Sequence, residues 1–182
     1  MNPTLYALCQ KTVLGPILWI SGQCAFPPLL PESPISLQAP GLILTKEFEA
    51  PVSKNYFLSF HVQFPSVEQR LNDTLIGSRF DVPCYGDDAK RAFDFPAERQ
   101  SDLGRPVKLH VKVLRLPKET VAWEADIASL CRAGHDLKAK KLQVLAVAHL
   151  AQGKYRIDVK NMEARPDLAA FGTSLTLHSG QK

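Results

Sequence analysis

The residues that could do chemistry in this 182-residue chain are few and poorly grouped. Tyr85-Gly86-Asp87-Asp88 looks like the paired-aspartate motif of polymerase palms, but the further carboxylates and the large scaffold of a palm domain are missing. Asp87, Asp88 and Asp94 do not follow the spacing of a calcium loop. No two of the five histidines have the i, i+2 or i, i+4 spacing of a zinc-ligand pair. We therefore expect no metal site.

Nucleophilic catalysis is not indicated either. The chain has no Gly-x-Ser-x-Gly elbow, and Cys131 with His135 lacks a visible third group to orient the histidine. It also has no glycine-rich phosphate loop. The sequence thus predicts no catalytic residues and no cofactor, and an enzyme is the function class that we expect least.

The charge balance does not favour nucleic acid as a partner. The net charge is +4, and the one dense basic run is Lys138, Lys140 and Lys141. This run leads into an apolar, strand-like segment, and no aromatic residues for base stacking are interleaved with it. We interpret it as a solvated strand entrance.

The N-terminus is typical of an export signal. Lys11 precedes an apolar run over 12–22, which is too short for a transmembrane helix but suits a secretory signal. Ile20-Ser21-Gly22-Gln23-Cys24 resembles a lipoprotein cleavage box with one extra residue, Gln23. We expect a signal peptide over 1–23, a lipid on Cys24 and a location in the periplasm, anchored to the membrane. The alternative is an apolar strand or helix packed on the core.

Export bears on two further segments. Cys84 and Cys131 would remain after signal cleavage, an even number in an oxidising compartment, which favours a disulfide between them over two unrelated buried thiols. Residues 24–40 hold five of the fourteen prolines. We predict a semi-rigid linker there, with an irregular arm lying on the folded domain as the alternative.

Residues 41–182 are predicted to form one all-β domain. Alternating apolar and polar residues indicate seven strands. In the strand over 55–64, Tyr56 and Phe60 face a core, whereas His61 lies on the other face and is expected to be solvated. The predicted strands cover 42–48, 55–64, 105–116, 120–127, 142–150, 154–160 and 173–178.

Two further patterns refine this fold. Val67, Leu71 and Leu75 predict a short helix that ends at Gly77. Leu150-x-x-Gly153-x-Tyr155 resembles the tyrosine corner of immunoglobulin-like sandwiches, in which a tyrosine hydroxyl bonds upstream backbone. We therefore predict an immunoglobulin-like, two-sheet antiparallel sandwich with one helix-containing insertion.

The insertion over 81–95 has the composition of a binding loop. It combines aromatic, arginine and acidic side chains, which are the kinds found at protein interfaces. An ordinary solvated loop is an equally good interpretation. The partner-binding candidates are Tyr85, Asp87, Asp88, Arg91 and Phe93.

Several segments, in order along the chain, resemble a family of bacterial lipoproteins from Burkholderia-like proteobacteria. They are the strand over 55–64, the segment 104–111, the tyrosine corner and Arg165-Pro166-Asp167-Leu168. Small periplasmic lipoproteins of this kind look like immunity proteins encoded beside secreted antibacterial toxins, including type VI lipases. The resemblance thus implies a protein that silences a toxin by tight, stoichiometric binding.

Two other function classes stay open. A structural or assembly lipoprotein of the cell envelope would make several weak contacts and have no toxin gene nearby. A small-molecule or glycan binder would expose a groove of aromatic side chains, but Trp19 lies in the predicted signal and Trp123 on an apolar strand face.

Overall fold

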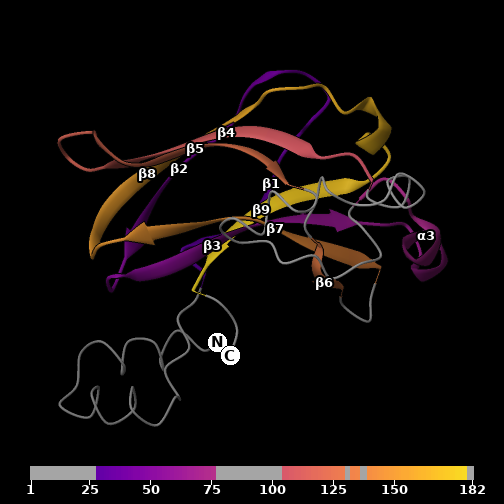
Figure 1. Cartoon of the computed structure of the whole chain (residues 1–182), viewed down its shortest axis with the longest axis horizontal. Helices are drawn as coiled ribbons and strands as arrows, with labels where there is room; N and C mark the ends of the chain where they lie inside the picture. The colour runs from indigo at the N-terminus through magenta and orange to yellow at the C-terminus, as the bar shows by residue number, and fades with distance from the viewer. Residues whose placement is uncertain (1–27, 77–103, 130–131, 136–138, 180–182) are drawn as a thin grey trace, which may run out of the picture.

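The computed structural model describes residues 28–76, 104–129, 132–135 and 139–179, and in these residues two antiparallel sheets face each other (Figure 1). The five-stranded sheet has the order β1-β9-β3-β7-β6, and the four-stranded sheet has the order β2-β8-β4-β5. The elements are β1 (Leu30–Pro34), β2 (Gly41–Ala50), β3 (Lys54–Gln63), α3 (Val67–Asn72), β4 (Val107–Arg115), β5 (Thr120–Ser129), β6 (Arg132–His135), β7 (Lys140–Leu150), β8 (Gly153–Asn161), the 3-10 turn η2 (Pro166–Leu168) and β9 (Gly172–His178). The predicted two-sheet sandwich and all seven predicted strands are confirmed.

Period-two alternation places the core between the sheets. β3 is the middle strand of the five-stranded sheet, and β4 is an inner strand of the four-stranded sheet. The side chains of both strands that face the other sheet are at most 1% exposed. They are Tyr56, Leu58, Phe60, Val62, Val107, Leu109, Val111 and Val113. Because successive strand residues point to opposite faces, the residues that alternate with these buried ones lie on the outer faces of the two sheets.

The prediction of a linker over 24–40 is wrong for its C-terminal part. Residues 30–34 form β1, which pairs antiparallel with β9 at the edge of the five-stranded sheet. Leu30 and Leu37 are both buried in the core. Proline is tolerated here because it lacks a backbone N–H, and an edge strand has positions whose N–H would not bond to a neighbouring strand. The folded domain therefore begins before residue 41.

Tyrosine corners hold the ends of two strands. The Tyr155 hydroxyl donates to the Ala151 carbonyl over 2.8 Å, as the sequence motif predicts. The Tyr56 hydroxyl donates to the Val52 carbonyl over the same distance and with the same offset of four residues. This second corner was not predicted because its segment lacks the glycine of the motif.

The helix α3 is shorter than predicted. The Ser66 hydroxyl accepts from the Gln69 N–H at its start, and α3 ends at Asn72 rather than near Gly77. The Asp73 carboxylate accepts from the backbone N–H groups of Leu75 and Ile76, both at 3.0 Å. These bonds replace the helical ones and stop the helix. Of the helices in the described ranges, none has the length and apolar character required to span a membrane.

We predict that Tyr155→Phe lowers the free energy of unfolding by about 1–2 kcal/mol, because the substitution leaves the ring in place but removes the bond to a partly buried carbonyl. Urea unfolding followed by tryptophan fluorescence measures the change. An unchanged midpoint would show that the corner does not stabilise the fold.

Candidate functional site

The site residues predicted from the sequence lie outside the described residues. They are Cys24, Cys84, Tyr85, Asp87, Asp88, Arg91, Phe93 and Cys131. The lipidation site, the disulfide and the binding loop therefore stay predictions. In the described ranges, no three histidine, cysteine or acidic side chains are grouped so that they could hold a metal ion.

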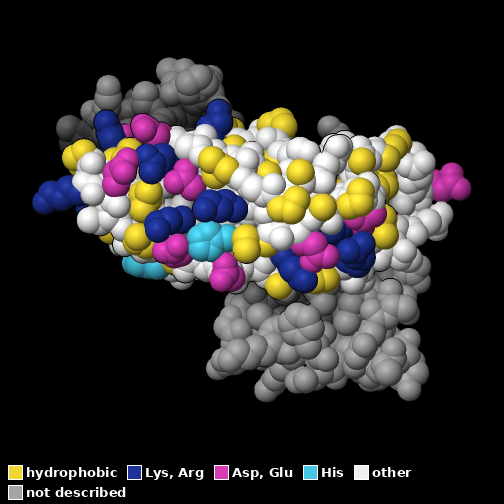
Figure 2. Space-filling model, turned by 90° about the horizontal axis from the view of Figure 1, so that it is seen from above, with side chains coloured by type: hydrophobic (Ala, Val, Ile, Leu, Met, Phe, Trp, Pro, Cys, Tyr) yellow, Lys and Arg dark blue, Asp and Glu magenta, His cyan; other side chains and the backbone are white. Residues whose placement is uncertain are grey.

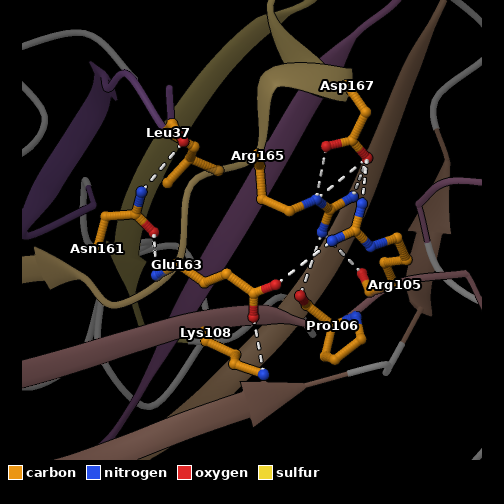
Figure 3. A network of polar contacts seen from close by, with 8 residues as sticks. All are labelled: Leu37, Arg105, Pro106, Lys108, Asn161, Glu163, Arg165 and Asp167. Atoms are coloured by element: carbon orange, nitrogen blue, oxygen red, sulfur yellow. Dashed lines mark hydrogen bonds and ion pairs between the residues drawn. The ribbon is translucent and has the colours of Figure 1, made fainter. Parts of the chain in front are cut away.

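A buried polar network surrounds Arg165, just before η2 (Figure 3). The side chain of Arg165 is buried. Its Nε and Nη2 atoms donate to the Asp167 carboxylate at 2.8–3.1 Å. Its Nη1 atom donates to the carbonyl oxygens of Arg105 at 3.0 Å and Pro106 at 3.1 Å. All three guanidinium nitrogens are thus engaged in joining the β8–β9 connection to the entrance of β4.

The same network holds the chain between β1 and β2. The Arg165 backbone N–H donates to the Leu37 carbonyl over 2.7 Å. The side-chain amide of Asn161, at the end of β8, donates to the carbonyl groups of Leu37 and Ala39 at 3.1 and 2.9 Å. The proline-rich arm is therefore fixed by hydrogen bonds as well as by its buried leucines.

Exposed ion pairs form the rim of this network (Figure 3). Glu163 accepts from Lys108 at 2.7 Å and from Arg105 at 3.3 Å. The hydrogen bond from Lys108 holds the pKa of Glu163 below its usual range. The hydrogen bonds from Arg165 lower the pKa of Asp167 in the same way. Both carboxylates are therefore charged at neutral pH.

A small cleft adjoins the network. It has a volume of about 270 Å³ and lies between residues 34–38 and the segment from Arg165 to Thr173. Its walls include Ile35, Leu37, Leu168 and Phe171. Because the Arg165 nitrogens are engaged within the chain, the cleft suits one apolar side chain better than a charged ligand.

The outer face of the five-stranded sheet carries two hydroxyl–imidazole pairs. Ser59 Oγ lies 2.9 Å from His178 Nε2, and Thr176 Oγ1 lies 2.8 Å from His61 Nε2. The expectation that His61 is solvated is wrong, because its ring is partly buried against β9. A serine bonded to a histidine is also the start of a hydrolase dyad, but Ser59 is fully buried and cannot meet a substrate in this arrangement.

On the outer face of the four-stranded sheet, charged side chains gather at one end, and apolar side chains lie together with a second group of charged ones towards the other end (Figure 2). His110 lies between two carboxylates, 2.7 Å from Asp126 and 3.2 Å from Glu124. Towards the end where β8 leads into η2, Leu42 and Met162 are 61% and 55% exposed. Because Leu42 pairs with Lys160 and Gly41 with Asn161, these two apolar side chains lie at the same end of the sheet.

Comparison with protein families identifies the domain. A family model described as a domain of unknown function (DUF5625) matches residues 32–179. The chain belongs to the DUF5625 family. The match starts inside β1, which agrees with an arm that is part of the domain. It includes every residue of the Arg165 network.

Solved structures support the fold of this DUF5625 domain. A crystal structure of a protein from Sulfurospirillum deleyianum aligns with a TM-score of 0.58 and 16% identity, covering 86% of this chain and all of that chain. At this identity the likeness shows the fold alone. A search of curated proteins gives no match.

We predict that Arg165→Met destabilises the domain by about 3 kcal/mol, because it leaves a partly buried carboxylate and two backbone carbonyl groups without their hydrogen-bond donor. Arg105→Met is the matched control. The side chain of Arg105 is largely exposed, so its loss should cost less than about 1 kcal/mol. Equal effects of the two substitutions in urea unfolding would contradict the proposed importance of burial.

We also predict a loss of stability in mild acid that depends on His178. Burial lowers the pKa of His178 from its ordinary value of 6.5. Below that pH the unfolded chain binds a proton more readily than the folded chain, so the free energy of unfolding falls as the pH drops towards the lowered pKa. His178→Gln should flatten this dependence, as measured by urea unfolding between neutral and mildly acidic pH. The same slope in both proteins would exclude His178 as its source.

Proposed function

We propose that this DUF5625 domain is an exported binding protein that neutralises a secreted antibacterial toxin by stoichiometric binding in the periplasm. The apolar run with Lys11 and the cleavage-box sequence before Cys24 support export and lipid anchoring. The resemblance of the chain to lipoproteins of the immunity type supports the choice of a toxin, such as a type VI lipase, as the partner. Neutralisation requires tight binding and no turnover.

The observation that carries the proposal is the exposed pair Leu42 and Met162 on a hydrogen-bonded sheet. Protein interfaces commonly have an apolar centre, in which methionine is enriched, inside a polar rim. Lys160 lies opposite Leu42 in the register, and the Lys108–Glu163 ion pair follows at the start of β4. Two exposed apolar side chains therefore lie at one end of the sheet with charged side chains beside them, which are the components of such a centre and rim.

Backbone order favours this surface for tight binding. β2 pairs with β8 from Gly41 to Ala50, with a shift of register between Leu42 and Leu44, and β8 pairs with β4. A surface held in this way loses little conformational entropy when a partner binds. The predicted loop residues Tyr85, Asp87, Asp88, Arg91 and Phe93 would add contacts beyond the sheet.

The test is co-purification of the full-length protein with the product of the adjacent gene, followed by an assay of toxin activity. We expect a one-to-one complex in which the toxin is inactive. Recovery of envelope components alone, with toxin activity unchanged, would overturn the proposal and favour a structural or assembly lipoprotein.

We predict that Leu42→Glu combined with Met162→Glu weakens that complex at least about tenfold, because charge is placed in the apolar centre. Leu71→Glu is the matched control, since Leu71 is 62% exposed on α3, away from this surface. Calorimetric titration gives the affinities, and thermal melting verifies that all variants are folded. If the double variant binds as tightly as the control, the apolar end of this sheet is not the interface.

A further inference from the structure

The chain enters the sandwich at the end where three short connections meet. These connections are residues 51–53 between β2 and β3, 116–119 between β4 and β5, and 151–152 between β7 and β8. β3 begins here, so its antiparallel neighbour β9 ends here, and β1, which is antiparallel to β9, begins here. We call this the entry end. The helix α3 and the turn η2 lie at the opposite end (Figure 1).

The lipid anchor of the proposed function would be attached close to the entry end. The described chain starts at Pro28, two residues before the first residue of β1. Cys24 precedes Pro28 by four residues, and a chain of that length spans at most about 14 Å. A lipid on Cys24 would therefore hold the entry end, rather than the end with the Arg165 network, next to the bilayer.

The entry end carries basic side chains that no described carboxylate neutralises. Arg115, Lys118 and Lys154 are exposed, and none of them forms an ion pair with another described residue. Arg115 Nη2 donates to the carbonyl oxygen of Gln152 at 3.2 Å, which holds the β4–β5 and β7–β8 connections side by side. The three cations are thus fixed on neighbouring connections of a hydrogen-bonded scaffold.

Two carboxylates at the entry end reduce this charge only in part. Glu119 is bound to Arg156 of β8, with Arg156 Nη1 2.7 Å from Glu119 Oε1. Glu49 lies opposite Lys154 in the register of β2 and β8. Positive charge therefore remains in excess at this end.

Basic side chains of the Arg165 network, at the opposite end, are already bound. Lys108 and Arg105 share Glu163 at 2.7 and 3.3 Å, and Arg165 binds Asp167 at 2.8 Å. A lipid phosphate would have to displace these carboxylates, and that exchange gains little free energy. The entry end is therefore the better of the two for contact with an anionic surface.

We propose that the entry end lies on the bilayer and that Arg115, Lys118 and Lys154 bind the phosphate groups of anionic phospholipids. The negative potential of such a membrane attracts basic side chains near it, and the contributions of several side chains add. The inference rests on the lipid anchor of the proposed function, which brings the three cations within reach of the headgroups.

The same orientation agrees with the proposed toxin-binding surface. Pro117 and Val121 are exposed near Lys118, and apolar side chains beside cations are typical of segments that lie at a membrane interface. Leu42 begins β2 and Met162 follows β8, so both lie at the opposite end. With the entry end on the membrane, these two side chains point away from it and stay open to a partner.

The test uses the full-length protein, purified from the membrane fraction and reconstituted into two kinds of vesicle. One kind contains phosphatidylcholine alone, and the other contains phosphatidylcholine with phosphatidylglycerol. Flotation of the vesicles reports the lipid anchor, and hydrogen–deuterium exchange with mass spectrometry reports which backbone segments contact the bilayer. We expect flotation with both. Exchange in residues 115–120 and 150–154 should be at least about fivefold slower on the anionic vesicles, and high salt should remove the difference.

Two double variants of equal net charge make the test specific. Lys118→Gln combined with Lys154→Gln should remove most of the slowing, because it takes two of the three cations from the entry end. Lys46→Gln combined with Lys112→Gln is the matched control, since these lysines lie in the middle of β2 and β4. The control should respond as the wild type does, and thermal melting verifies that both variants are folded.

The outcomes separate the membrane contact from the lipid anchor. Flotation with both kinds of vesicle, but equal exchange on both, would overturn the membrane contact and leave the anchor intact. Failure to float with neutral vesicles would refute the anchor. Flotation with anionic vesicles then tests the basic end by itself, and failure there also overturns the inference. Equal loss of slowing in the two double variants would attribute the effect to net charge rather than to the entry end.

Discussion

A buried guanidinium is unfavourable unless its N–H groups find acceptors, and this constraint organises one end of the DUF5625 sandwich. Arg165 meets it by bonding Asp167 and the carbonyl oxygens of Arg105 and Pro106. Its backbone N–H also holds Leu37. Three connections far apart in the chain are thereby joined, and β1 reaches the edge of the five-stranded sheet because the arm that follows it is fixed here.

The two tyrosine corners fix the starts of β8 and β3 by hydrogen bonds to the backbone that precedes each strand. Tyr155 stacks on Phe48 of β2 with ring centroids 5.6 Å apart while its hydroxyl bonds Ala151. Tyr56 bonds Val52 at the entrance of β3, in the other sheet. In both cases a large ring fills the core and its one polar atom is satisfied locally, so the apolar interior is not interrupted.

Alternation predicted the strands well because burial of one face leaves a direct trace in the sequence. It missed β1 and β6, in which no alternation of apolar and polar residues is visible. β1 is short and rich in proline, and β6 has only four residues. The role of Arg165 could not be predicted, since its partners include backbone atoms that are sixty residues away. The helix was predicted too long because Asp73 offers the backbone better bonds than another turn would.

The proposed interface could not be predicted from the sequence. Exposure of Leu42 and Met162 depends on which face each strand turns to solvent, and this is fixed only when β2 and β8 pair.

The distribution of satisfied and unsatisfied groups bears directly on function. The polar atoms of Arg165, Asn161 and Asp73 are engaged within the chain, so a ligand would gain little from them. Leu42 and Met162, in contrast, are apolar and face water. An exposed apolar side chain gains free energy when a partner surface removes it from water, whereas a polar atom that is already hydrogen-bonded within the chain gains little from a ligand. The exposed apolar side chains of the four-stranded sheet are therefore better candidates for partner binding than the Arg165 network.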